Sequence, residues 1–366
     1  ESKFLKSYLL AAETGSGKTL AYLIPLMSKL KDLETTEEWK HIQNHPVIRS
    51  VVLVPTMELV EQVTKTVKNM SHQVKLRAFG YGVNPQLTPA KLTSQRVDVL
   101  ITTPTKFINL YAKHANLVKY CSFMVADEAD SLLDESFGPE ITKAVAMCPN
   151  LTELVFTSAT IPRSFDKLIT KQYPDLNRLV TPGIHRVSRR IEFTTVNVWE
   201  PPFLDNKELA LNQALYSTHT DNKEDGLIKR VIVFRNNRKD VKSTVDFINK
   251  VGYDAFGVDG SVPYETRDEL IKDFITPPKR IDDSYEKKPH IKVMVTTDLL
   301  ARGIDMSAVR NVVLYDIPNT SIDLIHRIGR TGRMGKRGRV YLFVNKSENK
   351  PWIQGLKSYI RKGMSL

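Results

Sequence analysis

The hydrophobic pattern of the first half alternates between two kinds of segment. Short apolar runs that are typical of buried strands occupy residues 8–11, 50–54, 97–101, 123–126 and 154–156. Between them, apolar residues recur every three or four positions, as at Leu59, Val60, Val63 and Val67, which is the spacing of an amphipathic helix. Strands that alternate with helices predict a parallel sheet with helices on its faces. We therefore expect an α/β domain here.

The pattern breaks near Thr181 and then starts again. Pro182 and Gly183 lead into a basic run that ends at Arg190, and new apolar runs follow at 191–198, 231–234, 253–257, 292–295, 312–315 and 340–343. The break predicts a first domain over 1–183, a linker over 184–190 and a second parallel-sheet domain over 191–366. The proline-rich stretch 276–289 is predicted to be a long surface loop of unassigned role.

Composition narrows the class of partner. The 366 residues are enough for about two domains of ordinary size. Lys and Arg exceed Asp and Glu by 53 to 41, which gives a net charge of +12 and favours a polyanion such as nucleic acid, or an anionic membrane surface. No apolar run is long enough to cross a bilayer, so we expect no membrane insertion. The chain starts at Glu1 without a methionine, so we expect a preceding segment that would include any organelle transit peptide.

A glycine-rich stretch joins the first predicted strand to the first predicted helix. It reads Ala12, Glu13, Thr14, Gly15, Ser16, Gly17, Lys18, Thr19. Backbone amides in such a loop can surround phosphate oxygens, Lys18 can reach the β- and γ-phosphates, and the Thr19 hydroxyl can bind Mg²⁺. The stretch predicts a nucleoside triphosphate site. The alternative is a glycine-rich turn that only starts a helix.

Acidic and hydroxyl residues follow two further strands. Asp127 and Glu128 come directly after the run at 123–126, at the edge where the carboxyl ends of parallel strands meet. A carboxylate there suits Mg²⁺, which assigns Asp127 to the metal, and Glu128 can activate the attacking water. Ser158 and Thr160 can link this acidic cluster to a neighbouring group. The alternatives are a solvated helix start for the acids and a helix cap for the hydroxyls.

Turns after three strands of the first half combine small hydroxyl or glycine residues. They contain Thr56, Gly82 and Thr103 with Lys106. Exposed amides and hydroxyls at helix starts suit the phosphate oxygens of a nucleic acid. Ordinary helix capping explains each turn equally well when it is taken alone. Their shared position at one edge favours a nucleic-acid strand.

The second half contributes arginines and a threonine pair. Arg327, Arg330 and Arg333 recur every third residue among glycines, and arginines at such a place can neutralise charge on a transferring phosphoryl group. The alternative is a basic loop that binds nucleic-acid phosphates. Thr296 and Thr297 follow a predicted strand and can donate to phosphate, and Asp305 can accept a ribose hydroxyl; these residues alone are a weak signal.

Taken together, the motifs resemble those of the DEAD-box RNA helicases over nearly the whole chain. They occur in the order AETGSGKT, PTMEL, TPTK, DEAD, SAT, TTDLLARGID and HRIGRTGR. The resemblance implies two tandem RecA-like, doubly wound domains that close together on ATP and single-stranded RNA. It also implies an RNA-dependent ATPase with Mg²⁺ as the metal.

The resemblance assigns roles by position. Ser158 and Thr160 would couple hydrolysis to unwinding, Arg330 and Arg333 would be the arginine fingers, and His326 belongs to the same catalytic set. The nucleotide contacts would be Ala12, Thr14, Gly15, Ser16, Gly17, Lys18, Thr19, Gly303 and Asp305. The RNA contacts would be Thr56, Gly82, Thr103, Lys106, Gly260, Arg267, Thr296 and Thr297.

Some positions depart from the family pattern. Met57 stands where arginine is usual, Tyr81 where the first of two glycines is usual, and Thr105 with Lys106 where Gly-Arg is usual. The family's adenine-reading glutamine motif lies upstream of the phosphate loop and is not seen in the residues before Ala12. Preference for ATP is therefore an implication of the resemblance.

The segment after Asp130 resembles the mitochondrial branch of the family, which assists assembly of the large mitochondrial ribosomal subunit. We therefore expect a monomer in the mitochondrial matrix that acts on ribosomal RNA or on a ribosomal assembly intermediate, with the nucleus or nucleolus as the alternative location. The leading hypothesis is local unwinding of short RNA duplexes through sequence-independent backbone contacts. An ATP-gated RNA clamp, in which hydrolysis drives release, has the same motifs. A DNA helicase is a third hypothesis.

Overall fold

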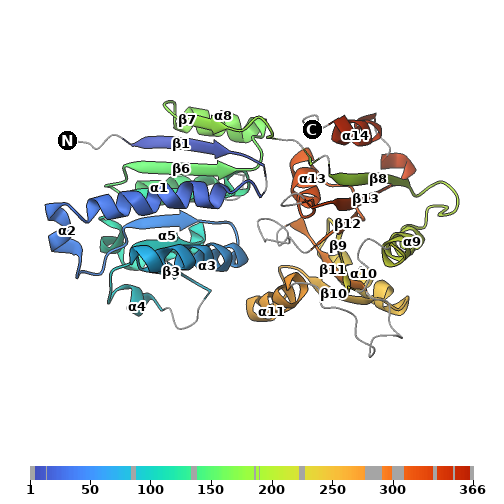
Figure 1. Ribbon diagram of the computed structural model, residues 1–366, viewed down its shortest axis with the longest axis horizontal. Coiled ribbons are helices and arrows are strands. Elements are labelled where there is room, and N and C mark those ends of the chain that lie inside the picture. Colours follow the sequence, from blue (N-terminus) through green and yellow to red (C-terminus); the bar gives the residue numbers. More distant parts are fainter. Residues whose placement is uncertain are drawn as a thin grey trace. The chain divides into compact units, whose positions relative to one another are not determined.

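The computed structural model describes residues 5–13, 15–83, 88–132, 138–184, 187–188, 190–221, 227–276, 291–298, 309–332, 336–348 and 351–362. The chain divides into two compact units, Glu1–Ile184 and His185–Leu366. Each unit is a parallel sheet covered by helices, which confirms the predicted α/β class (Figure 1). Four predicted site residues lie outside the described residues: Thr14, Gly303, Asp305 and Arg333. So does residue range 277–290, which covers most of the predicted surface loop.

The first unit has a seven-stranded sheet with the order β3-β4-β2-β5-β6-β1-β7. Its strands are β1 (Lys6–Ala11), β2 (Ser50–Leu53), β3 (Ala78–Gly80), β4 (Val99–Thr102), β5 (Phe123–Ala126), β6 (Glu153–Ser158) and β7 (Asn177–Val180). All four residues of β7 are exposed, and the strand pairs in parallel with β1 at the edge of the sheet. Sequence analysis missed β7 because an exposed edge strand carries no buried apolar run.

Helices cover both faces of this sheet. They are α1 (Lys18–Leu33), α2 (Glu37–Ile42), α3 (Met57–Val74), α4 (Pro89–Leu92), α5 (Pro104–Lys113), α6 (Ala129–Leu132), α7 (Gly138–Ala146) and α8 (Arg163–Gln172), with the 3₁₀ helix η1 (Ala115–Val118). Helices α1 and α3 pack their apolar stripes on one face, and α5, α7 and α8 pack on the other. The buried strands are apolar on both sides, as a sheet between two helical layers requires.

The second unit repeats the plan with six parallel strands in the order β10-β11-β9-β12-β13-β8. They are β8 (Ile191–Asn197), β9 (Lys229–Phe234), β10 (Asp254–Val258), β11 (Ile291–Thr296), β12 (Asn311–Leu314) and β13 (Gly338–Val344). The helices are α9 (Lys207–His219), α10 (Lys239–Lys250), α11 (Tyr264–Ile275), α13 (Ser321–Ile328) and α14 (Pro351–Lys362), with the 3₁₀ helix η4 (Lys346–Glu348). Helices α9 and α10 pack on one face, and α11, α13 and α14 pack on the other.

Strand order brings three predicted motifs of the first unit together. Strand β6 lies between β5 and β1, and Ala11 is in register with Ser158. The phosphate loop after β1, the acids after β5 and the hydroxyls at the end of β6 therefore lie at the same edge of the sheet. Sheets of this kind bind ligands at that edge, beyond the carboxyl ends of the strands.

The helices in the described part of the chain are too short or too polar to cross a bilayer.

Candidate active site

The phosphate loop is shaped by two glycines in the left-handed region. Gly15 has φ +77° and Gly17, which caps α1, has φ +93°. A Cβ atom built at either glycine would have no heavy atom within 4 Å, so the space beside the loop is open. Backbone amides at the start of a 16-residue helix favour an anion there.

Lys18 lies folded over this loop. Its Nζ atom donates to the carbonyl oxygen of Ala12 at 2.7 Å and to that of Glu13 at 3.0 Å. These acceptors belong to the loop itself, so the lysine is held at the place where phosphates would bind. A phosphate group would replace the two carbonyl oxygens as its partner.

Asp127 is the most enclosed acid of the site, with a side chain that accepts hydrogen bonds on both oxygens. Tyr22 donates to Oδ2 at 2.9 Å, the backbone amide of Glu128 donates to Oδ1 at 3.0 Å, and the hydroxyl of Thr157 also donates to Oδ1. The residue is only 6% exposed. Three donors therefore fix the orientation of this carboxylate.

Burial is the largest cause of the shifts in the pKa values of Asp127 and Tyr22. Burial raises the pKa of Asp127, and the nearby charge of Glu128 raises it further, while the hydrogen bonds from Thr157 and Tyr22 and the charge of Lys18 act in the opposite direction. Burial and the Asp127 charge raise the pKa of Tyr22 well above 10. Tyr22 is therefore a neutral hydrogen-bond donor at physiological pH.

Glu128 has an unusual backbone conformation. Its φ of +54° lies in the left-handed region, which residues with a Cβ adopt at a cost of about 1 kcal/mol. Its carbonyl accepts from the amides of Ser131 and Leu132, which begins α6. The buried Oε2 atom has no hydrogen-bond partner among the described residues. A strained residue with an unused carboxylate oxygen is typical of a reaction site.

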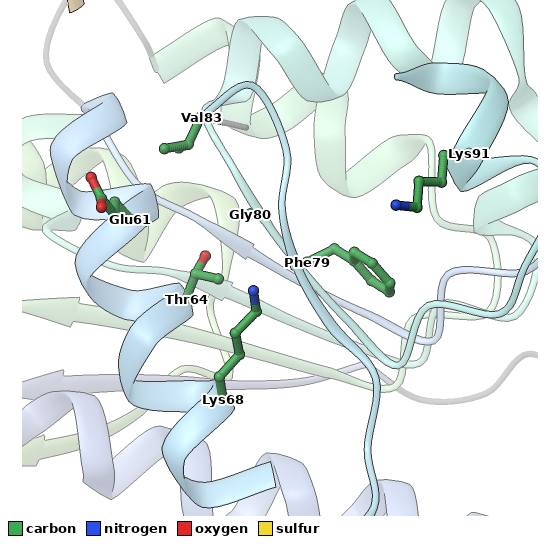
Figure 2. Close-up of a pocket in the computed structure, with 7 residues that line it drawn as sticks. All are labelled: Glu61, Thr64, Lys68, Phe79, Gly80, Val83 and Lys91. Atoms are coloured by element: carbon green, nitrogen blue, oxygen red, sulfur yellow. The ribbon is translucent and has the colours of Figure 1, made fainter. Parts of the chain in front are cut away.

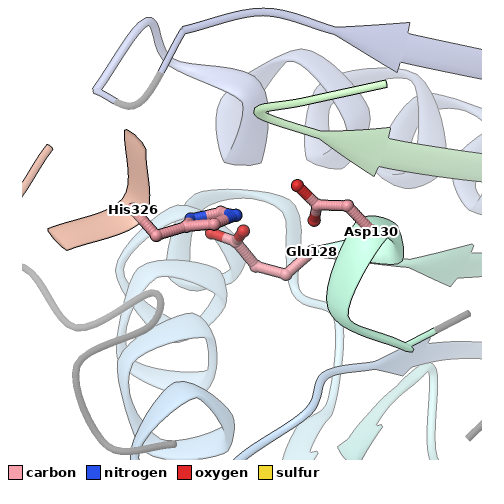
Figure 3. A group of neighbouring side chains, drawn as sticks. All are labelled: Glu128, Asp130 and His326. Atoms are coloured by element: carbon pink, nitrogen blue, oxygen red, sulfur yellow. The ribbon is translucent and has the colours of Figure 1, made fainter. Parts of the chain in front are cut away.

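Asp130 and the Ser158–Thr160 segment form one hydrogen-bonded group. The Thr160 hydroxyl donates to Asp130 Oδ2 at 2.6 Å, and the Ser158 hydroxyl donates to the Thr160 carbonyl at 2.6 Å. Figure 3 shows the side chains of Glu128 and Asp130 beside α6. The next helix, α8, has Pro162 as its N-cap and no side-chain capping bond, so neither hydroxyl caps α8; that of Thr160 bonds to the acidic cluster, and that of Ser158 bonds to the Thr160 backbone.

The residues of the first unit that were assigned to RNA have defined local roles. The Thr56 side chain caps α3 by accepting from the amide of Leu59 at 3.4 Å, whereas Thr103 makes no such bond at the start of α5. Gly82 has φ +97°, and a Cβ there would lie 2.5 Å from the Lys106 side chain. Glycine therefore lets Lys106 lie directly on the backbone. Contact with RNA stays a prediction for all four residues.

A cavity of about 350 Å³ lies next to Gly82 on the edge strand of the first sheet. Its lining residues are Glu61, Thr64, Lys68, Phe79, Gly80, Val83 and Lys91. Figure 2 shows Lys68 from α3 and Lys91 from α4 on opposite sides, with the Phe79 ring nearer Lys91. A Cβ on Gly80 would lie 2.4 Å from the Thr64 hydroxyl oxygen, so α3 approaches β3 closely. Sequence analysis did not predict this cavity.

Arg327 is tied into the second unit by a bidentate ion pair. Its Nε and Nη2 atoms each donate to Asp298 at 2.6 Å, Nη2 also donates to Asn236 at 2.7 Å, and Nη1 donates to the Asp316 carbonyl at 3.2 Å. These partners follow β11, β9 and β12. The guanidinium therefore joins the carboxyl ends of three strands, which is a structural role.

Arg330 and His326 are neighbours on and just after α13. The Arg330 Nε atom donates to the His326 carbonyl at 3.0 Å, which is a bond to the last turn of the helix. His326, also drawn in Figure 3, belongs to α13 of the second unit. The predicted catalytic roles of both residues stay predictions.

Three of the four residues of the second unit assigned to RNA lie at or just beyond strand ends, and the fourth lies on a helix. The fully buried Thr296 uses its hydroxyl to donate to the Val258 carbonyl at 2.8 Å, so it joins β11 to β10. Thr297 follows it, and Gly260 lies in the turn after β10. Arg267 lies on α11 with its guanidinium 5.8 Å from the Tyr264 ring centre. Thr296 has a structural partner, and RNA binding by the set stays a prediction.

Sequence analysis missed two side chains that contact Asp127. Tyr22 lies one turn after Lys18 on the buried face of α1, where it is indistinguishable from a core residue, and Thr157 lies within an apolar strand. A possible signal was available, because a buried tyrosine hydroxyl usually needs a partner. Nothing in the sequence says which partner it has.

Comparisons with known proteins agree with this geometry. The family described as DEAD/DEAH box helicase matches residues 2–168, and the helicase conserved C-terminal domain matches residues 210–335. The chain is 39% identical to a Vanderwaltozyma polyspora protein named ATP-dependent RNA helicase MRH4, mitochondrial, with 99% of this chain and 75% of that protein covered. The Saccharomyces cerevisiae protein of the same name is 38% identical, with 99% and 72% covered.

Solved structures show the same fold. S. cerevisiae Dbp5 bound to RNA and ADP BeF3 matches with a TM-score of 0.72 at 24% identity, over 97% of this chain and 83% of that one. Mss116p bound to ssRNA and AMP-PNP matches with a TM-score of 0.75 at 22% identity, over 96% and 69%. With the two family matches and the relatives above, these findings show that the chain belongs to the DEAD-box family of ATP-dependent RNA helicases.

Proposed function

We propose that this chain binds single-stranded RNA through its backbone and uses ATP hydrolysis to separate short RNA duplexes or to remodel RNA-protein complexes. The observation that carries the proposal lies in the first unit. There the open phosphate loop, the fixed Asp127 carboxylate and the strained Glu128 follow neighbouring strands of one sheet. Family membership supplies the nucleotide and the substrate class.

The residues of this site divide the chemical work. Lys18 exchanges the carbonyls of Ala12 and Glu13 for phosphate oxygens. Glu128 orients the attacking water and accepts its proton, for which its unpartnered Oε2 atom is suited. The Thr19 hydroxyl and the Asp127 carboxylate are oxygen donors that fit Mg²⁺, and they would hold it. When bound, Mg²⁺ supplies positive charge to the β- and γ-phosphates.

The second unit supplies positive charge in this proposal, and the first unit supplies the coupling. Arg330 and Arg333 neutralise the γ-phosphoryl group when the two units close on ATP, and Gly303 and Asp305 contact the nucleotide. Ser158 and Thr160, of which Thr160 bonds to Asp130, link the acidic cluster to RNA binding. The family resemblance supports these roles.

The RNA surface is proposed to follow the turns at Thr56, Gly82, Thr103 and Lys106 in the first unit. Lysines 68 and 91 in the neighbouring cavity add positive charge next to Gly82. Contacts of this kind go to phosphates and 2′-hydroxyls, so binding is independent of base sequence and weakens as salt rises.

The place of action follows from the relatives. Proteins that are 39% and 38% identical are named mitochondrial, which supports a mitochondrial location, and we place the chain in the matrix. We further propose that it acts as a monomer on ribosomal RNA within an assembly intermediate of the large ribosomal subunit. The sequence after Asp130 and the net charge of +12 support this part.

Two assays on the same protein test the proposed activity. ATP turnover is measured with and without single-stranded RNA, and displacement of a short labelled RNA duplex is measured in parallel. We expect RNA-stimulated turnover together with displacement. Turnover without displacement would support an ATP-gated clamp, and equal stimulation by DNA would remove RNA specificity.

Crosslinking the protein to RNA inside cells tests the proposed target. We expect enrichment of ribosomal RNA from the large mitochondrial subunit. Recovery mainly of nuclear or nucleolar transcripts would contradict both the location and the target.

A further inference from the structure

The hydroxyl of Tyr22 contacts one of the residues assigned to Mg²⁺. It donates to Asp127 Oδ2 at 2.9 Å across 105 positions of sequence. This bond joins the first turns of α1, where the other assigned residue, Thr19, also lies, to the end of β5.

The ring that carries this hydroxyl is held firmly. Tyr22 is 1% exposed and belongs to the apolar cluster that α1 and α3 form on the sheet, with Leu26 and Val52 among its members. A side chain packed in this way has little rotamer freedom. Its hydroxyl is therefore held in a fixed position beside the Asp127 carboxylate.

The Asp127 carboxylate needs such a reference point. Its Oδ1 atom has two donors, the Glu128 amide and the Thr157 hydroxyl, while Tyr22 is the donor to Oδ2 among the described residues. Without Tyr22, the Oδ2 atom would lose the one hydrogen-bond donor that it has among the described residues. Groups that orient a metal-binding side chain typically affect metal affinity by about 10- to 100-fold.

We propose that Tyr22 is a positioning residue for Mg²⁺ that holds the Asp127 carboxylate in the orientation the ion requires. The inference rests on the proposed function, because it takes Asp127 as a residue that holds the metal. It adds a residue outside the phosphate loop and the acidic motif. In this role Tyr22 touches neither nucleotide nor metal.

The purely structural alternative is that the hydroxyl only satisfies its own need for a buried partner. In that case its removal lowers stability and leaves metal binding unchanged. The two explanations therefore differ in the Mg²⁺ dependence of binding and agree on stability.

The test is Tyr22→Phe, which removes the hydroxyl and keeps the ring. The affinity for a fluorescent ADP analogue is measured with Mg²⁺ and with EDTA, below the thermal unfolding midpoint of each variant. We expect the gain in affinity that Mg²⁺ provides to fall about 10-fold, with little change in EDTA. A Mn²⁺ titration followed by electron paramagnetic resonance should show the same loss directly.

Two further variants make the result interpretable. Tyr173→Phe is the matched control, because Tyr173 packs on Phe156 in the apolar cluster on the other face of the sheet. It should leave the Mg²⁺ gain unchanged. Thr157→Val removes the hydroxyl that donates to Oδ1 and should lower the gain in the same direction as Tyr22→Phe.

The outcomes separate the inference from the function on which it rests. An unchanged Mg²⁺ gain in Tyr22→Phe would overturn the inference, whatever the change in stability. Wild-type protein that binds the nucleotide equally well with Mg²⁺ and with EDTA would count against the proposed metal site itself. A loss confined to Tyr22→Phe and Thr157→Val would support the positioning role.

Discussion

The two units share an architecture but use the carboxyl ends of their strands differently. In the first unit, Lys18 contacts only carbonyls of its own loop and Glu128 has a carboxylate oxygen without a hydrogen-bond partner among the described residues. In the second unit, the side chains of Arg327 and Thr296 form hydrogen bonds that join neighbouring strands. The same edge is the proposed ligand site in one sheet and an internal brace in the other.

This difference teaches that a motif of polar residues at a strand end has no single meaning. Parallel sheets leave carbonyls and amides at that edge, and side chains can either satisfy them or turn toward a ligand. We expect substitutions in the first unit to alter chemistry and substitutions in the brace to alter stability. Four experiments test that division.

Arg330→Ala should have the largest effect. We expect ATP turnover to fall by about 10³-fold, because a missing arginine finger leaves charge on the γ-phosphoryl group unneutralised. Nucleotide affinity should stay close to wild type, and the unfolding midpoint should fall less than in an Arg327 variant, although Arg330 is also buried. Arg238→Ala, at the exposed N-cap of α10, is the control. A loss of stability as large as that of an Arg327 variant would place Arg330 with the brace instead.

Glu128→Gln should follow, with RNA-stimulated turnover lower by about 10²- to 10³-fold because the amide cannot accept the proton of the attacking water. Binding of ATP and RNA should persist, since the shape of the side chain is kept. Glu38→Gln, on the exposed start of α2, is the matched control. Intact RNA-stimulated turnover in Glu128→Gln would remove Glu128 from the mechanism.

Arg327→Met should mainly destabilise the second unit. Removing one partner of a nearly buried ion pair leaves Asp298 without its bidentate donor, and we expect a loss of roughly 3 kcal/mol in the free energy of unfolding. Chemical denaturation followed by a signal from each unit measures this loss. A variant with normal stability but no ATP turnover would contradict the structural role.

Lys68→Ala combined with Lys91→Ala should have the smallest effect. We expect RNA affinity to fall about fivefold at moderate salt and its salt dependence to become shallower, since each lost phosphate contact releases one fewer counterion. Lys167→Ala with Lys171→Ala, on α8 and outside the lining of the cavity, is the control. Equal losses in both pairs would show only a general effect of net charge.

The fold was predictable because most strands are buried on both faces. Runs such as those that became β5 and β9 have no exposed residue, so apolar sequence and strand coincide. The exposed strand β7 owes its conformation to pairing with β1, which is a tertiary effect that a local pattern does not contain. The prediction failed there for that reason.

The site was predictable only in part. The phosphate loop and the acids were found because their chemistry requires particular residue types at fixed spacing. The arginine spacing gave Arg327 and Arg330 the same appearance, whereas in the structure Arg327 joins three strand ends and Arg330 donates to the last turn of α13. Tyr22 and Thr157 were missed because their partner, Asp127, is distant in the sequence.

The left-handed backbone at Glu128 sets activity against thermodynamic stability. Glycine adopts that conformation without the steric penalty of a Cβ, so Glu128→Gly should raise the free energy of unfolding by up to about 1 kcal/mol. The same change would delete the carboxylate that we propose activates the attacking water. Under that proposal, a selection for heat resistance alone would favour loss of this carboxylate, and only a requirement for ATP turnover would keep glutamate there.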